Sequence, residues 1–257
     1  MYANMERVEF KNFRGLNIVG ILDKPETAAP YPIVLALHGF GGNKESGEEW
    51  PEIFLPLGIA VLRIDFSGSG ESDGKYEEKT VTDFLDDTKS ALDFICELEE
   101  VNKNMIAVVG HSMGGCVTIL SAARDERVKT AVASVPAIKV GEVIAGLYSK
   151  EELIKLEQQG YVETTKFGDP RKLNKTFFDD AKNYDLAKEG QGIPYKFLVL
   201  GAAKDTVVPL EQIKEFCDKT PNAVLATFPN SDHNLEEDWP EIENRIRDWF
   251  SNWISKK

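Results

Sequence analysis

The chain has 257 residues, of which 42% are hydrophobic and 28% are charged, and its formal net charge is −13. This size and composition predict a soluble globular protein with one sizeable core, or one core with an insertion. An acidic surface repels nucleic acid and anionic membranes, so neither is expected as a partner.

The cysteines and the first residues indicate the compartment. Cys96, Cys116 and Cys217 are odd in number and widely spaced, which argues against a disulfide framework and against a CxxC metal site. The opening MYANMERVEF holds two acids and no apolar run, so it does not resemble a signal peptide. No later stretch is long enough to span a bilayer. We therefore expect a cytoplasmic protein.

The first half of the chain alternates between strand and helix patterns. Residues 6–22 alternate apolar and polar side chains and predict two strands joined around Gly15. Apolar residues at helical spacing predict amphipathic helices over 81–98 and 112–123. Continuous apolar runs, typical of strands buried on both faces of a parallel sheet, lie at 31–39, at the start of 59–72, at 105–110 and at 128–136.

This alternation breaks at residues 137–191, which are too many for a single crossover helix. We expect the segment to form a cap over the main sheet. Its patterns predict a helix at 149–160, a strand turning back at Gly168-Asp169-Pro170 within 161–174, and a second helix at 175–186.

The strand and helix patterns then resume and give the fold class. Strands are predicted at 195–201 and 223–228, and helices at 210–220 and 239–254. The whole pattern predicts an α/β fold with a mostly parallel, eight-stranded sheet and helices on both faces. The expected parts are the first part of the core at 1–136, the inserted cap at 137–191, and the second part of the core at 192–257.

The stretch VVGHSMGGCV, residues 108–117, predicts an exposed nucleophile at Ser112. Gly110 and Gly114 lie two residues either side of it, as a sharp strand-to-helix turn requires. A serine hydroxyl needs a base, and the chain has three histidines: His38, His111 and His233. His111 adjoins the serine and leaves the turn in another direction, and His38 more simply pins its loop. The base is therefore expected to be His233, in a loop after the last strand.

The base needs an orienting acid at the same sheet edge. Asp205 follows the strand ending at Gly201, and parallel strands bring their carboxyl ends to one edge. Asp232 and Asp185 are weaker alternatives, because Asp232 adjoins the histidine and Asp185 lies in the cap. The sequence thus predicts a Ser112–Asp205–His233 triad.

Acyl transfer also needs donors for the developing oxyanion. The glycine-rich LHGFGGNK follows a predicted strand, and the Phe40 backbone N–H is one candidate donor. The second is the Met113 N–H, in the first turn of a helix, where amides have no intrahelical partner. No group of His, Cys or Asp has metal-ligand spacing, so neither a metal nor another cofactor is expected.

The motifs in this order resemble the α/β-hydrolase family. GHSMG resembles its nucleophile elbow, HGFGG its oxyanion loop, GAAKDTVVP its acid loop and SDHNL its histidine loop. The resemblance covers residues 31–136 and 194–255. It implies a serine hydrolase that works through an acyl-enzyme.

The short HGFGG loop and the inserted cap are similar to those of bacterial feruloyl and cinnamoyl esterases. This similarity implies a carboxylic ester hydrolase acting on small-molecule esters, with the cap supplying much of the acyl pocket. Aromatic cap residues that could line that pocket are Tyr148, Tyr161, Phe167, Phe177 and Phe178. A thioesterase, a monoacylglycerol lipase and a serine peptidase remain alternatives on the same triad, as does a non-catalytic ligand-binding protein. The oligomeric state is left open, with a homo-oligomer among the alternatives.

Overall fold

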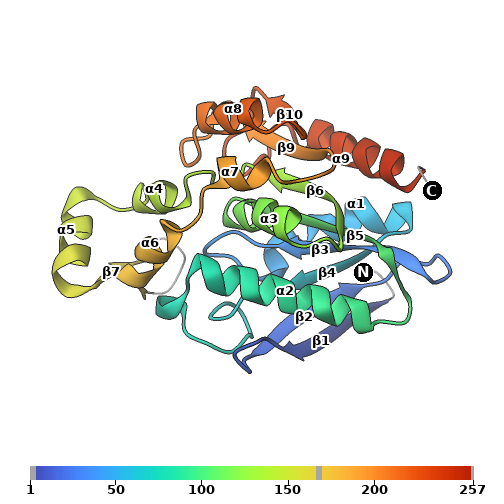
Figure 1. The fold of residues 1–257 in the computed structure, drawn as a ribbon, viewed down its shortest axis with the longest axis horizontal. Helices are drawn as coiled ribbons and strands as arrows, with labels where there is room; N and C mark the ends of the chain where they lie inside the picture. The colour runs from blue at the N-terminus through green and yellow to red at the C-terminus, as the bar shows by residue number, and fades with distance from the viewer. Residues whose placement is uncertain (1–3, 166–169, 256–257) are drawn as a thin grey trace.

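An eight-stranded sheet forms the centre of the molecule in the computed structural model, which describes residues 4–165 and 170–255 (Figure 1). The strand order is β1-β2-β4-β3-β5-β6-β9-β10. The β1–β2 and β2–β4 pairs are antiparallel, and the remaining pairs are parallel, as predicted. The strands are β1 (Met5–Lys11), β2 (Asn17–Asp23), β3 (Tyr31–Leu37), β4 (Ala60–Ile64), β5 (Val101–His111), β6 (Val128–Ser134), β9 (Phe197–Ala202) and β10 (Ala223–Phe228).

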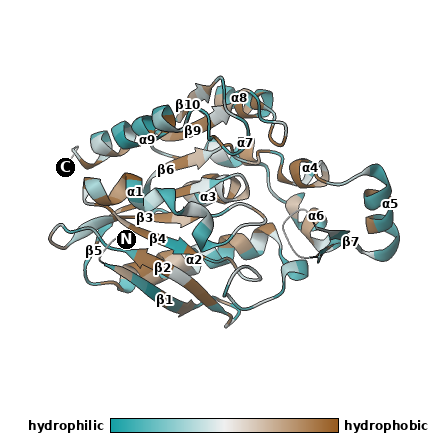
Figure 2. Ribbon diagram, turned by 180° about the vertical axis from the view of Figure 1, so that it is seen from behind, coloured by the Kyte–Doolittle hydropathy of each residue, from teal (hydrophilic) through white to brown (hydrophobic). Residues whose placement is uncertain are grey.

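The central strands are buried on both faces, which explains their continuous apolar sequence. On β5, Val108 belongs to one buried cluster and its neighbour Val109 to another, because successive side chains point to opposite faces. One face is covered by α2 (Val81–Glu97), α3 (Met113–Arg124) and α8 (Leu210–Lys219), and the other by α1 (Glu49–Phe54) and α9 (Trp239–Ile254). Figure 2 shows brown, hydrophobic strands between helices that mix brown with teal.

The segment between β6 and β9 lies largely to one side of the sheet (Figure 1). Within it, Ser149 begins α5 with a capping box, and Gly160 ends it with φ 81°. The predicted turn at Gly168-Asp169 lies outside the described residues, and the domain boundaries at 136 and 191 stay a prediction. The elements are α4 (Val140–Ala145), α5 (Lys150–Gln159), the antiparallel strands β7 (Tyr161–Thr164) and β8 (Arg171–Asn174), α6 (Lys175–Ala181) and α7 (Leu186–Gly190).

Two predicted elements need correction next to the candidate nucleophile. The helix expected to start at Ser112 starts at Met113, because Ser112 has φ 55° and ψ −110°, which is not a helical conformation. The strand expected at 105–110 begins earlier, at Val101, because residue 101 pairs with Tyr31 across the sheet. Both differences follow from tertiary pairing and turn geometry that local periodicity does not record.

Candidate active site

Ser112 occupies a strained turn between β5 and α3. Its backbone, with φ 55° and ψ −110°, lies in a region that side-chain-bearing residues rarely occupy. The turn is held by its own backbone: the Ser112 N–H donates to the Ser134 carbonyl at 2.9 Å, and the Ala137 N–H donates to the Ser112 carbonyl at 3.1 Å. The side chain makes no N-cap hydrogen bond to α3, so Ser112 is not acting as an ordinary capping serine.

The two glycines around Ser112 allow β5, α3 and the β3 loop to approach closely. A Cβ on Gly110 would lie 2.3 Å from the Gly114 carbonyl oxygen, and a Cβ on Gly114 would lie 2.1 Å from the Leu37 carbonyl oxygen. Neither distance can accommodate a methyl group. The glycines in GHSMG are therefore required by packing as well as by the turn.

Asp205 and His233 come together at the carboxyl edge of the sheet, after β9 and β10 respectively. The His233 Nδ1 lies 2.7 Å from Asp205 Oδ2. The other Asp205 oxygen accepts from the Val207 N–H at 2.7 Å and the Val208 N–H at 2.8 Å, and the carboxylate is fully buried. Because the carboxylate accepts the Nδ1–H, the imidazole keeps Nε2 as its free base.

The alternative acids hold other groups. Asp232 accepts from the Asn234 N–H at 2.9 Å, and its side chain is exposed. Asp185 caps α7 by accepting from the Lys188 N–H at 3.1 Å. The structure therefore pairs His233 with Asp205 and with neither alternative.

The His111 ring connects the histidine loop to the nucleophile turn. Its centroid lies 4.9 Å from the His233 centroid, edge to face, and His111 directly precedes Ser112. Among the described residues, no hydrogen bond joins the Ser112 hydroxyl to the His233 ring, whose nitrogen Nδ1 is held by Asp205. In enzymes without bound substrate this contact is commonly long and tightens in the Michaelis complex.

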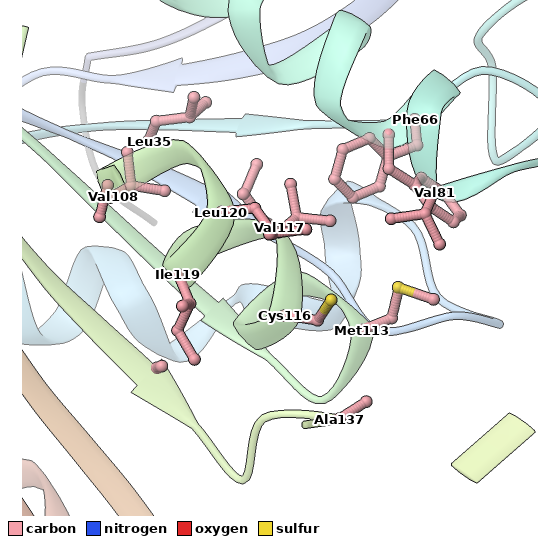
Figure 3. Close-up of a cluster of buried hydrophobic side chains, with 14 of the residues drawn as sticks. Leu35, Phe66, Val81, Val108, Met113, Cys116, Val117, Ile119, Leu120 and Ala137 are labelled. Atoms are coloured by element: carbon pink, nitrogen blue, oxygen red, sulfur yellow. The ribbon is translucent and has the colours of Figure 1, made fainter. Parts of the chain in front are cut away.

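The loop and the helix start that carry the predicted oxyanion donors both adjoin Ser112. A Cβ on Gly39 would lie 3.7 Å from the Ser112 Cβ, which puts the loop carrying Phe40 against the nucleophile. Met113 is the first residue of α3, so its N–H has no partner within the helix. The Met113 side chain belongs to the buried apolar cluster drawn in Figure 3. The donor roles of Phe40 and Met113 stay a prediction.

His38 holds the loop that carries Phe40. Its Nδ1 donates to the Gly39 carbonyl at 2.7 Å, and its Nε2 accepts from the Phe66 N–H at 3.2 Å. Burial lowers the pKa of His38 to about 3, so the ring stays neutral and keeps both hydrogen bonds. This geometry agrees with the loop-pinning role expected for His38.

His111, which is half-buried, and Cys116, which is buried, lie next to the nucleophile turn, and both have pKa values shifted toward the neutral form. Burial lowers the pKa of His111 to about 3, with a smaller contribution from His233. A neutral His111 avoids like-charge repulsion when its neighbour becomes an imidazolium. Burial also raises the pKa of the Cys116 thiol to about 12, and Figure 3 shows this side chain within the apolar cluster.

The aromatic residues around the site come from both the core and the inserted segment. The Phe40 ring packs edge to face on Phe177 at 5.0 Å and on Tyr76 at 5.7 Å. Sequence reasoning singled out Phe177 but missed Tyr76, which lies in a short 3-10 helix without a periodic signal. Tyr161 instead lies under Lys172, and Phe167 is outside the described residues.

Over residues 4–165 and 170–255, no cluster of three or more His, Cys, Asp or Glu could hold a metal ion. No helix in that part of the chain combines the length and apolar character needed to cross a membrane.

Residues 28–183 match the family described as serine aminopeptidase, S33. The palmitoyl-protein thioesterase ABHD10, mitochondrial, of Mus musculus is 26% identical over 198 residues, covering 72% of this chain and 63% of that protein. The chain therefore spans less than two thirds of this relative's length.

Solved structures share the fold. The Est1E protein of Butyrivibrio proteoclasticus, solved with ferulic acid bound, superposes with a TM-score of 0.85 at 23% identity, covering 96% of this chain and 99% of that chain. The alpha/beta hydrolase domain-containing protein 10 from mouse gives 0.76 at 22% identity, covering 98% and 99%. These likenesses show the α/β-hydrolase fold that the motif order predicted.

Proposed function

The chain belongs to the serine aminopeptidase S33 family of α/β-hydrolases and is a hydrolase, and we propose that it cleaves carboxylic esters through an acyl-enzyme on Ser112. One observation carries the proposal. The Asp205 Oδ2 and His233 Nδ1 atoms are 2.7 Å apart. The His233 ring also contacts the ring of His111, the residue that directly precedes the strained Ser112, so the pair lies beside the serine turn. A hydroxyl, a base and a buried acid at one sheet edge are the components of acyl transfer.

In the proposed mechanism, Ser112 Oγ attacks the ester carbonyl while His233 Nε2 takes its proton. Asp205 fixes the imidazole tautomer and stabilises the imidazolium. The Phe40 and Met113 N–H groups bind the oxyanion of the tetrahedral intermediate. His233 then returns its proton to the leaving alcohol, and water hydrolyses the acyl-enzyme by the same steps in reverse order.

For the acyl group we propose a flat aromatic or other small-to-medium acyl chain, including cinnamoyl and feruloyl groups. Two observations support it. The Phe40 side chain packs against the rings of Tyr76, Phe84 and Phe177, so the apolar surface behind the candidate oxyanion loop is aromatic, which favours flat apolar groups beside it. The structural neighbour Est1E was solved with ferulic acid.

Kinetics on four substrate types test the reaction class. The panel is methyl ferulate with p-nitrophenyl butyrate, an S-palmitoyl thioester, a monoacylglycerol and an aminoacyl p-nitroanilide. We expect the highest kcat/KM on methyl ferulate or p-nitrophenyl butyrate, the two small oxygen esters, and no measurable turnover by Ser112→Ala. A preference for the thioester, the glyceride or the anilide would replace the ester proposal by a thioesterase, a lipase or a peptidase, respectively. A folded protein inactive on all of them would favour a ligand-binding role.

Methyl ferulate compared with methyl butyrate tests the acyl group separately. We expect a higher kcat/KM on the ferulate. Exclusive turnover of the short aliphatic ester would overturn the aromatic acyl proposal and leave the ester hydrolase standing.

A further inference from the structure

The strand β1 forms one edge of the sheet (Figure 1), and in the described part of the chain it pairs with β2 alone. Two hydrogen bonds show which of its backbone groups face β2. At one end of the pair, the Asn12 N–H donates to the Leu16 carbonyl. At the other end, the Lys24 N–H donates to the Asn4 carbonyl. Hydrogen-bonded pairs alternate along an antiparallel ladder, so the even-numbered residues of β1 bond to β2 and the odd-numbered residues point their N–H and C=O groups outward.

These outward backbone groups form an open row of donors and acceptors. The residues that carry them are all exposed, namely Met5, Arg7, Glu9 and Lys11. Over residues 4–165 and 170–255, none of their N–H or C=O groups makes a backbone–backbone hydrogen bond. An open row on an edge strand is a template for one further strand. The partner that fits this edge is therefore an extended segment of backbone.

The charges on β1 are balanced, although the protein as a whole is acidic. Within the strand, Arg7 and Lys11 offset Glu6 and Glu9, whereas the whole chain has a formal net charge of −13. Two copies of an acidic protein repel each other over most of their surfaces. A neutral edge is the place where two copies can approach with the least repulsion.

The order of the charges favours one register with a second copy of the chain. A two-fold axis at Val8 makes the two β1 strands antiparallel and places Arg7 opposite Glu9 of the second copy, on both sides of the axis. Met5 then lies opposite Lys11, and every outward backbone group has a partner. An axis at Arg7 or at Glu9 also brings the outward rows together, but it places that charged side chain opposite itself. Like charges directly opposite each other are destabilising, so the axis at Val8 is preferred.

The edge strand is already fixed in an extended shape. Val8 belongs to the buried core, and the Phe10 ring stacks on the Phe94 ring of α2 with centroids 5.0 Å apart. On the other face of the strand, the Arg7 Nε donates to Glu71 Oε2 at 2.9 Å. A strand that is ordered before it binds loses little conformational entropy when it pairs.

We propose that two copies of this chain dimerise through β1, with the two-fold axis at Val8, and so join their sheets into one. The strand backbones supply the hydrogen bonds, and the Arg7–Glu9 pairs between copies fix the register. The contact is one short strand from each copy, so we expect a weak dimer with a Kd of roughly 1–100 µM. The inference concerns assembly and does not depend on the proposed ester hydrolysis.

Sedimentation velocity of the full chain from about 1 to 300 µM tests the dimer, and the wild type should shift from monomer to dimer over this range. Arg7→Glu and Glu9→Arg should each weaken dimerisation by about 10-fold or more, because each places like charges opposite one another. An equimolar mixture of these two variants should restore the dimer, because opposite charges then face each other again, and only between different chains. Lys214→Glu on α8 and Glu241→Arg on α9 make the same charge changes at exposed positions outside β1 and should leave the dimer unchanged.

Amide hydrogen exchange of the wild type tests the backbone pairing and requires no variant. Above the Kd, the Arg7 and Glu9 N–H groups should exchange about 10-fold more slowly than in dilute protein, whereas those of Val8 and Phe10, which face β2, should not change. A wild type that stays monomeric, a dimer that both charge variants leave intact, or a mixture that does not restore it would overturn the proposal. A dimer without added protection at Arg7 and Glu9 would also overturn it, because the copies would then meet at another surface.

Discussion

At the scale of single residues, the backbone of Ser112 is strained in a conformation that suits glycine better than serine. Its φ of 55° with ψ −110° costs on the order of 1–3 kcal/mol for a residue with a side chain. The sharp turn carries the hydroxyl beyond the end of the sheet, where the His233 loop can approach it. The strained backbone of Ser112 thus lowers the protein's free energy of unfolding, at the residue on which the proposed activity depends.

Replacing Ser112 by glycine separates strain from chemistry. We expect Ser112→Gly to be inactive yet more stable to urea than Ser112→Ala by about 1 kcal/mol, because only glycine relieves the strained φ. Ser112→Ala is the matched control, since it also lacks the hydroxyl but keeps a Cβ. Equal unfolding free energies for the two variants would contradict the strain.

A second residue-scale feature is the buried ammonium of Lys79. Its Nζ donates to Ser69 Oγ at 2.6 Å and lies 4.2 Å from the Tyr76 ring centroid, while the residue is 2% exposed. Burial, with a smaller repulsion from Arg171, lowers the pKa of Lys79 to about 7. The folded state therefore releases this proton at a lower pH than the unfolded chain does.

This shift predicts a pH-dependent stability with a definite sign. Between pH 7 and the ordinary lysine pKa of 10.5, the unfolded chain binds a proton that the folded protein does not, so stability rises with pH. We expect the wild type to gain about 3 kcal/mol relative to Lys79→Met between pH 7 and 9.5, measured by urea unfolding. The exposed Lys75→Met serves as control and should follow the wild-type curve. Parallel curves for Lys79→Met and the wild type would rule out the depressed pKa.

The sequence specified the candidate site residues better than it specified their surroundings. Three histidines and one strand-edge aspartate leave few combinations, so the sequence predicts the Asp205–His233 pair that the structure joins at 2.7 Å. The burial of Lys79 is a feature that could not be predicted from the sequence. Its neighbours Ser69, Tyr76 and Phe84 come from separate elements, so nothing in the local sequence distinguishes it from an exposed lysine.

At the scale of secondary-structure elements, the close packing of α3 on the loop after β3 aligns Ser112 with the candidate oxyanion loop. Gly114 is the contact point, because its missing Cβ leaves room for the Leu37 and His38 carbonyl oxygens. Any side chain there would push α3 away from β3 or displace the loop. The distance between Ser112 and Phe40 therefore depends on this glycine.

A glycine-to-alanine pair tests this packing. We expect Gly114→Ala to lower stability by about 1–3 kcal/mol or more and to reduce kcat strongly, since the added methyl overlaps backbone atoms. Gly141→Ala is the matched control in α4, where an added Cβ meets Ala181 Cβ at an ordinary 3.5 Å. That change should be neutral or stabilising, because alanine favours helices. Thermal unfolding and ester turnover of both variants give the comparison, and a fully active, stable Gly114→Ala would refute the account.

Strong, long periodic elements were predictable, and short ones were not. The strands β3, β5 and β6 were predictable because continuous apolar residues mark both of their faces. The helix α2 was predictable because its apolar residues mark one face at helical spacing. The helices α1, α4 and α7 have five or six residues each and depend on tertiary packing, so their sequences carry little pattern.

At the scale of the whole molecule, a small polar network ties the inserted segment to the core helices. Asp180 accepts from the Thr82 N–H at 2.9 Å and from the Thr82 hydroxyl at 2.7 Å, at the start of α2. Arg124 at the end of α3 pairs with Glu189 and lies over the Tyr184 ring. These contacts hold α6 and α7 against the core on the side of Phe177.

Removing the central acid of this network should loosen the inserted segment alone. We expect Asp180→Ala to raise amide hydrogen exchange across residues 140–190 by about 5- to 10-fold, with the sheet unchanged, because two hydrogen bonds are lost. Asp179→Ala is the control, since that exposed side chain pairs with Lys182 within the segment. Unchanged exchange in Asp180→Ala, or equal loosening in both variants, would show that the network does not hold the segment.

The overall architecture could be predicted because it depends on element order, but the arrangement of the inserted segment could not. The sequence singled out its aromatic residues without indicating which ring faces which partner. Phe177 packs on Phe40, whereas the adjacent Phe178 packs on Tyr148. Adjacent helical residues point in different directions, and only the packing of α6 decides which direction faces the core.

Covalent labelling by a fluorophosphonate tests the central claim most directly, because the probe needs an activated serine and an oxyanion site but no particular acyl group. Intact-mass and peptide measurements should show one adduct, located on Ser112. The labelling rate should fall by about 10³-fold or more in His233→Ala and vanish in Ser112→Ala. A folded wild-type protein that stays unlabelled, an adduct on another residue, or an unchanged rate in His233→Ala would contradict the account.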